Sequence, residues 1–228
     1  MKSKPSTASD YHPDQLDRVH SVCLYISTII GDYMDDLVIV GGLVPNLIIP
    51  QAPPPAGTEA HVGTQDLDIG FSLGVLNSDR YQEIAERLRG AGFNPDVNEN
   101  QNPTFQRWRL EQSVNVTFDF LIPQTAQDEI GGTVKHFEKD FGAVITPGLE
   151  LAFQDRIKLT ITGQTPFGEE AAREIWVCGP GAYTILKRDF SAPGLVGPVR
   201  VARFIFGHPD EETQVEVAGF VKQVLDRI

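Results

Sequence analysis

Residues 65–72 have the sequence QDLDIGFS, in which apolar residues alternate with acidic or small ones. In an extended strand successive side chains point to opposite faces, so the apolar residues share one face and Asp66 and Asp68 share the other. From strand rise alone, the Cα atoms of these two residues are roughly 6.5–7 Å apart. That spacing suits two carboxylates that bind one or two divalent cations, and hard oxygen ligands of this kind select Mg²⁺ or Mn²⁺.

The segments on either side of this strand predict further elements. Apolar residues recur at helical spacing over 14–30, and the short run LVIV at 37–40 ends in Gly41-Gly42. We expect a helix, then a buried strand that turns sharply at the two glycines, then a short helix over 43–49. A helix over 79–89 follows the acidic strand.

A later pair of strands carries a third carboxylate. Residues 105–111 and 114–122 have the alternation of a hairpin, and in the second strand the apolar residues face one way while Asp119 faces the other. If this strand neighbours the acidic strand, Asp119 lies close to Asp66 and Asp68.

These elements predict an α/β (α+β) fold, a mixed sheet with flanking helices and a smaller C-terminal portion. We expect a core over 1–145 and a second portion over 146–228, packed on the core. The second portion would contain strands at 151–162 and 174–178 and helices at 182–189 and 211–225.

Composition narrows the functional classes. The chain has 228 residues and a formal net charge of -12, which argues against broad, sequence-independent binding to nucleic acid. Cys23 and Cys178 are its two cysteines, too few for a disulfide framework, and a reducing cytoplasm is the expected location. The most apolar stretch, 37–50, is too short to span a bilayer, and the polar start has no apolar export segment.

Each of these signals has a simpler interpretation when taken alone. Alternating acids occur on solvated strand faces, and any tight turn uses glycine. Arg107 and Arg109 share a strand face by their spacing, where they would contact a phosphate backbone or simply solvent. The order of the signals, a Gly-Gly turn, then Asp-x-Asp, then an isolated Asp on a later strand, is more specific than any one of them.

In this order the segments VIVGGLVPNLI, HVGTQDLDIGFSL and VNVTFDFLI resemble the nucleotidyltransferase fold of the polymerase-beta type. The segments PGLELAFQDRIKLTITG, IWVCGPGAYTILKRDF and GPVRVARFIFG are similar to AbiEii-type nucleotidyltransferase toxins of bacterial type IV toxin–antitoxin systems. The first resemblance covers about residues 37–123, and the second covers most of the chain beyond the N-terminal helix.

The resemblance implies a role for each matching residue. Gly41 and Gly42 would let the backbone approach a triphosphate, and Thr64 would add a hydroxyl contact to phosphate. Asp66, Asp68 and Asp119 would be catalytic and would bind Mg²⁺ or Mn²⁺, with Asp119 on the second ion, where it favours deprotonation of the attacking hydroxyl. Lys187, in AYTILKRDF, matches a lysine that contacts the nucleotide phosphates, and a solvated helix position is its alternative reading.

The implied activity is metal-dependent transfer of a nucleotidyl group from an NTP to an acceptor hydroxyl. The acceptor would be an RNA 3′ end, such as that of tRNA, or a protein hydroxyl, and an antitoxin would be a partner. A catalytically silent nucleotide- or partner-binding domain and an antibiotic-type small-molecule nucleotidyltransferase are the alternatives. The chain departs from the family in one respect: a Lys-Asp-x-Tyr-Asp-Leu-like element expected after Lys187 is absent.

Overall fold

The computed structural model describes residues 14–48, 64–72, 78–98, 100–110, 116–127, 129–138, 141–186, 208 and 210–215. By spatial contacts the chain divides into two compact units. One runs from Asp14 to Gly179 and contains every described strand, and the other includes the residues from Pro180 onward.

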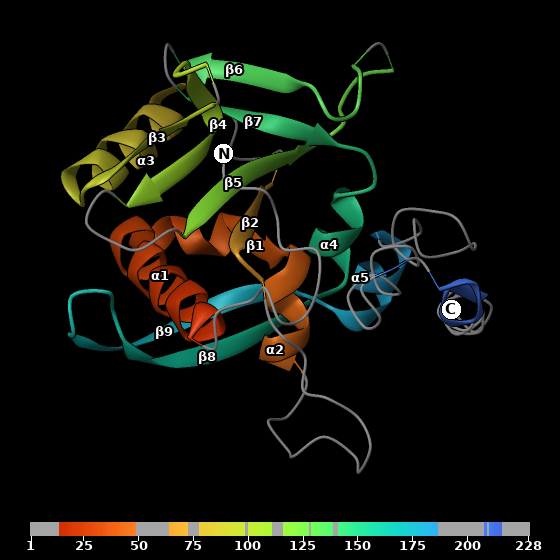
Figure 1. Cartoon of the computed structure of the whole chain (residues 1–228). Helices are drawn as coiled ribbons and strands as arrows, with labels where there is room; N and C mark the ends of the chain where they lie inside the picture. The colour runs from red at the N-terminus through yellow and green to blue at the C-terminus, as the bar shows by residue number, and fades with distance from the viewer. Residues whose placement is uncertain are drawn as a thin grey trace. The chain divides into compact units, whose positions relative to one another are not determined.

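The first unit is built on a mixed sheet with flanking helices, as the sequence predicts, and nine strands of this sheet lie in the described residues (Figure 1). The strands are β1 (Leu37–Val40), β2 (Asp66–Phe71), β3 (Phe93–Val97), β4 (Pro103–Leu110), β5 (Thr117–Pro123), β6 (Val134–Glu138), β7 (Phe141–Thr146), β8 (Arg156–Gln164) and β9 (Glu170–Cys178).

The strand order brings the two acid-bearing strands together. It reads β3-β4-β5-β2-β1-β9-β8, with β7 pairing the second half of β5 and β6 pairing β7. β2 runs antiparallel to β1 and parallel to β5, whereas β4 and β5 form the predicted antiparallel pair. β5 is therefore flanked by β2 on one side and β4 on the other, which places its polar face between theirs.

Helices α1 (Gln15–Ile30) and α3 (Ser78–Gly90) cover the apolar face of this sheet. The ring of Phe71 on β2 contacts Tyr81 of α3, and Tyr25 of α1 contacts Phe93, which in turn meets Phe118 on β5. Large aromatic rings dominate this core because each buries a large apolar area. Asp66, Asp68 and Asp119, at the alternate positions of the same strands, face the side away from these helices.

The connection after β1 is short and helical. A 3-10 turn, η3 (Gly41–Leu43), leads into α2 (Val44–Ile48), and Pro45 lies in the first turn of α2, where a missing N–H costs little. A second 3-10 segment, η2 (Gly31–Asp36), connects α1 to β1.

One predicted strand is wrong at its start. The apolar stretch expected as one strand from Leu151 begins instead with a helix, α4 (Glu150–Gln154), and only then becomes β8. The compact unit that ends at Gly179 includes β9, which pairs with β1 in the central sheet.

In the second unit the structure describes helix α5 (Pro180–Leu186) and a helical turn at 211–215. Within the described ranges no helix has the length and apolar character that crossing a membrane requires.

Candidate active site

The three predicted carboxylates lie on two neighbouring strands and on one face of the sheet. In the parallel pair of β2 and β5, Asp68 is the direct partner of Asp119, and Asp66 is the direct partner of Thr117. Neighbouring strands are about 4.8 Å apart, and directly paired residues in a sheet point to the same face. The predicted placement of Asp119 beside the acidic strand is confirmed.

The Gly-Gly turn lies directly against these acids. β1 and β2 pair so that Val40 faces Asp68, and the chain turns immediately after Val40. Gly41 has φ +74°, and a methyl group on it would overlap the Asp68 carboxylate. Glycine is required here for two reasons, a left-handed backbone and close approach to a carboxylate.

Thr64 lies between the Gly-Gly turn and the start of β2. A Cβ atom on Gly42 would lie 2.7 Å from Thr64 Cβ and 2.8 Å from its Oγ1. The Thr64 hydroxyl donates to the Asp66 carbonyl at 2.9 Å and accepts from the Asp66 N–H at 3.3 Å. These two bonds fix the backbone at the point where β2 begins, so Thr64 orients Asp66 as well as lining the turn.

An arginine occupies the centre of the acidic face. Arg107 on β4 is the direct partner of Asp119 on β5, and its Nε and Nη2 donate to the two Asp119 oxygens at 2.8 and 2.6 Å. The same Nη2 lies 4.0 Å from Asp66 Oδ2. Asp66 Oδ1 in turn accepts a hydrogen bond of 2.9 Å from the Thr117 hydroxyl.

The Arg107–Asp119 pair is largely shielded from water. The side chains of Arg107 and Asp119 are 17% and 14% exposed, whereas that of the neighbouring Arg109 is 52% exposed. The hydrogen bonds to Asp119 raise the pKa of Arg107 above its ordinary value, although burial opposes this. Arg107 is therefore a fixed positive charge among the predicted metal ligands.

This pair lies among the carboxylates that the sequence predicts as metal ligands. Among the described residues no group of three or more Asp, Glu, His or Cys side chains is arranged to hold an ion. Both oxygens of Asp119 accept hydrogen bonds from Arg107. The roles of Asp66, Asp68 and Asp119 as ligands of Mg²⁺ or Mn²⁺ stay a prediction, which rests on their hard carboxylate oxygens.

Of the remaining predicted site residues, Lys187 lies outside the described residues. The role of Arg107 was missed from the sequence, where it was assigned to a phosphate contact or a solvated edge. The signal was present: Arg107 and Asp119 both fall on polar positions of two strands predicted to form a hairpin. Only the register of that hairpin was needed to pair them.

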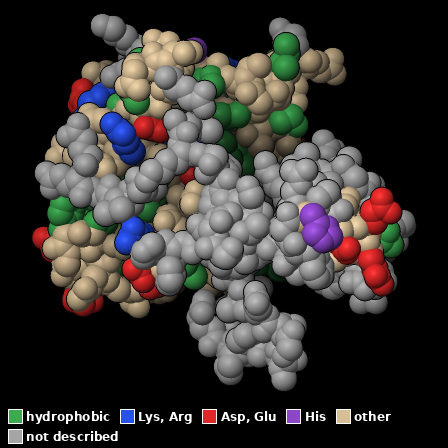
Figure 2. All heavy atoms as spheres, viewed as in Figure 1, with side chains coloured by type: hydrophobic (Ala, Val, Ile, Leu, Met, Phe, Trp, Pro, Cys, Tyr) green, Lys and Arg blue, Asp and Glu red, His purple; other side chains and the backbone are tan. Residues whose placement is uncertain are grey.

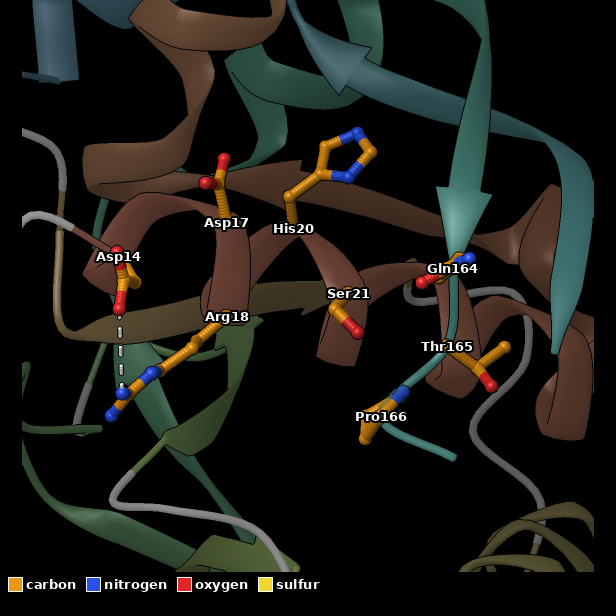
Figure 3. A pocket seen from close by; sticks show the side chains of 8 residues that line it. All are labelled: Asp14, Asp17, Arg18, His20, Ser21, Gln164, Thr165 and Pro166. Atoms are coloured by element: carbon orange, nitrogen blue, oxygen red, sulfur yellow. Dashed lines mark ion pairs between the residues drawn. The ribbon is translucent and has the colours of Figure 1, made fainter. Parts of the chain in front are cut away.

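A pocket of about 550 Å³ lies elsewhere in this unit, between the start of α1 and the end of β8 (Figure 3). One wall holds Asp14, Asp17, Arg18, His20 and Ser21, and the other holds Gln164, Thr165 and Pro166. Asp14 and Arg18 form an ion pair across one helical turn there. The pocket includes none of the predicted site residues, so the acidic face of β2 and β5 remains the candidate for chemistry.

Comparison of the chain with protein-family models, with curated proteins and with solved structures finds no match in any of the three. The resemblance to nucleotidyltransferases accordingly stays a prediction based on the residues named above.

Proposed function

We propose that this protein is a metal-dependent nucleotidyltransferase that moves a nucleotidyl group from an NTP to an acceptor hydroxyl. One observation carries the proposal: a Gly-Gly turn and a pair of alternate carboxylates meet on one sheet face, directly beside the third acid. Glycine at the turn leaves backbone N–H groups open to a phosphate, and carboxylates on the adjoining strand supply cation ligands.

The role proposed for each site residue follows from the requirements of phosphoryl transfer. The transferred group carries negative charge, so positioning and charge neutralisation supply most of the rate enhancement. Asp66 and Asp68 would hold Mg²⁺ or Mn²⁺, which when bound neutralises phosphate charge and orients the NTP. Gly41 and Gly42 would admit the phosphates, and Lys187 would contact them as a point charge.

The acceptor class is proposed from the resemblance together with the charge pattern. A toxin of a toxin–antitoxin system would modify an RNA 3′ end, such as that of tRNA, or a protein hydroxyl, and would bind an antitoxin. Among the side chains coloured in Figure 2, Lys and Arg lie singly, mostly near Asp or Glu. On the face that this view shows, an acceptor would be bound through few phosphate contacts.

The experiment is incubation of the full chain with each α-labelled NTP, Mg²⁺ and total RNA or cell protein. Label should transfer to one acceptor class and should be lost in Asp66→Ala and Asp68→Ala. Asp96→Ala is the matched control, because Asp96 is a largely buried acid on β3 that pairs with Arg109, outside the Gly-Gly turn. Transfer that survives both Asp66→Ala and Asp68→Ala contradicts the proposal.

A second candidate is a catalytically silent nucleotide- or partner-binding domain. The observation that favours it is the ion pair that occupies both oxygens of Asp119. The same incubation separates the two candidates, because the silent domain binds NTP without transferring label and is insensitive to Asp66→Ala.

A further inference from the structure

Strand β8 forms one edge of the sheet (Figure 1). It pairs with β9 at nine consecutive positions without a register shift, and within the described residues no second strand pairs with it. An edge strand presents a row of N–H and C=O groups on its outer side. Proteins normally protect such an edge with short strands, bulges, prolines or charges. β8 has no bulge and no proline, so its length and regularity leave it open to pairing with another strand.

Two other described edges of the sheet are protected in the usual way. β3 has five residues, contains Pro95 and has a register shift between Pro95 and Val97. β6 also has five residues and a register shift, between His136 and Glu138. Both features twist an edge and interrupt its row of hydrogen-bonding groups. The contrast singles out β8 as the edge suited to an added strand.

The two basic side chains of β8 lie over β9 and not along the outer edge. Lys158 Nζ lies 3.2 Å from a Glu174 oxygen, and the Arg156 guanidinium lies 4.2 Å from the centre of the Trp176 ring. Glu174 and Trp176 both belong to β9. Charged side chains on an edge usually repel an added strand. Here they are bound on the inner side, toward the neighbouring strand.

The apolar face of β8 is only partly covered. Ile157 and Leu159 are half-buried, whereas their direct partners on β9, Val177 and Ile175, are fully buried. Neighbouring strands are only about 4.8 Å apart, so a strand added beside β8 would place its own apolar side chains against Ile157 and Leu159. The edge therefore combines a row of backbone hydrogen-bonding groups with incompletely buried apolar side chains.

The sequence of β8 fits a second copy of itself in antiparallel register. With a two-fold axis at Thr160, all nine residues of one strand face residues of the other. The central pairs are then Thr160 with Thr160, Lys158 with Thr162, and Leu159 with Ile161. Each basic residue faces a neutral one, because Arg156 and Lys158 lie in the first half of the strand and the second half carries no charge. Parallel pairing in register would place each basic residue opposite its own copy, and like charges directly opposite are unfavourable.

We propose that two copies of this chain associate through β8, by antiparallel pairing of the two β8 strands about an axis at Thr160. Each copy would use the same edge, so the interface is closed and the assembly stops at two chains. The sheet of one copy would continue into the sheet of the other. This inference does not depend on the proposed nucleotidyl transfer.

The test is the mass of the full chain in solution, measured by light scattering on a size-exclusion column over a series of protein concentrations. The wild-type protein should approach twice the mass of one chain as its concentration rises. Thr160→Lys should raise the dissociation constant by about fivefold or more, because it places two lysines directly opposite each other. Ala172→Lys is the matched control. It adds the same charge at an exposed position on the same face of β9, one strand from the edge, and should leave the dissociation constant unchanged.

A charge exchange tests the register and guards against misfolded variants. Thr160→Glu alone should also dimerise more weakly, and mixing it with Thr160→Lys should restore the dimer, because opposite charges then meet at the axis. A variant that does not fold cannot be rescued in this way. The inference is overturned by a wild-type protein that keeps the mass of one chain at every concentration. It is equally overturned by a dimer that Thr160→Lys does not weaken, or by a mixture that associates no better than its components. A single-chain mass would leave this edge to an extended segment of a different protein.

Discussion

Single residues in this site are fixed by their neighbours across the sheet. Arg107, Asp119, Asp68 and Val40 follow one another directly across β4, β5, β2 and β1. Because strands are separated by only about 4.8 Å, a change in one of these side chains acts on the next. Site substitutions should therefore be compared with substitutions of the same kind outside this row.

Gly41→Ala should remove the activity while costing only modest stability. The left-handed backbone of Gly41 costs a β-carbon roughly 1–2 kcal/mol, and the new methyl group also displaces the Asp68 carboxylate. Gly132→Ala is the matched control, since Gly132 has φ +83° and nothing within 4 Å of its added Cβ. Urea unfolding should show similar losses of stability in the two variants, and label transfer should be lost only in Gly41→Ala. Equal activity in the two variants would contradict the contact with Asp68.

Arg107→Ala should destabilise the fold by about 2 kcal/mol, because it leaves a largely buried Asp119 without its two charge-assisted hydrogen bonds. Arg109→Ala should change the free energy of unfolding by at most about 0.5 kcal/mol, because Arg109 is half exposed and its nitrogen lies 3.6 Å from Asp96. Urea denaturation of the two variants measures both values. Similar losses in both would mean that the Arg107 pair contributes no more than an ordinary surface pair.

At the scale of elements, β5 has two separate functions. Thr117 and Asp119 line the acidic face, and the alternate residues Phe118, Phe120 and Ile122 are buried in the core. Phe120 contacts the rings of Phe71, Phe118 and Phe141. The core therefore sets the position of the site, because a one-residue slip of β5 would exchange its faces.

Phe120→Ala should lower the free energy of unfolding by about 3–5 kcal/mol, since it leaves a cavity among fully buried rings. Phe167→Ala is the control, because Phe167 is 48% exposed, and it should cost less than about 1 kcal/mol. Thermal or urea unfolding measures the difference. Near-equal costs would contradict the core assigned to β5.

The elements that the sequence predicted well are those with strong periodicity. The helix over 14–30, the strand at Leu37–Val40, the acidic strand and the hairpin strands are all present. The sequence did not predict β3, because Asn94, Pro95 and Asp96 disfavour strands. β3 is an edge strand, and a proline in an edge strand costs the sheet little. α4 was read as part of a strand because a short apolar run fits either structure.

The sequence predicted which carboxylates lie together in the candidate site, but it did not predict their hydrogen-bond partners. Alternation along a strand predicts which carboxylates share a face, so Asp66, Asp68 and Asp119 could be grouped from the sequence. It does not predict cross-strand register, which places Arg107 directly beside Asp119. The pairing of β9 with β1 joins residues that are far apart in the chain, and local patterns carry no information on it.

At the scale of the whole molecule, the reactivity of the two cysteine thiols measures how tightly the first unit is packed. Cys23 lies in α1 and Cys178 at the end of β9, and burial raises the pKa of each to about 12. At pH 8 about one thiol in ten thousand is then ionised, and only the thiolate reacts. Both should resist a thiol reagent in the native protein.

Because α1 packs on β9, both thiols should become reactive in one cooperative urea transition that coincides with the loss of circular dichroism. The single-thiol variants Cys23→Ala and Cys178→Ala report each site separately. Reaction of either thiol well below the unfolding midpoint would contradict a single cooperative unit from Asp14 to Gly179.

The net charge of -12 bears on an RNA acceptor. Many described basic side chains are already bound to acids, among them Arg87 with Asp32 and Glu83, and Lys135 with Glu129. Phosphate contacts must then come mainly from other cations, and we expect Lys187 and the adjacent Arg188 to be among them. Each phosphate contact on a single strand contributes about -0.7 to the slope of log affinity against log salt.

If RNA is the acceptor, the double variant Lys187→Gln/Arg188→Gln should flatten that slope by about 1.4. The control is Lys158→Gln/Arg173→Gln, which removes the same charge from β8 and β9 and should leave the slope unchanged, because Lys158 is paired with Glu174. Fluorescence anisotropy with labelled tRNA between 50 and 200 mM salt, about the range over which such contacts are lost, gives the slopes. Equal slopes in both double variants would mean that the cations act only through net charge. Because an RNA acceptor held at the site would contact particular cations, that result would favour a protein or small-molecule acceptor.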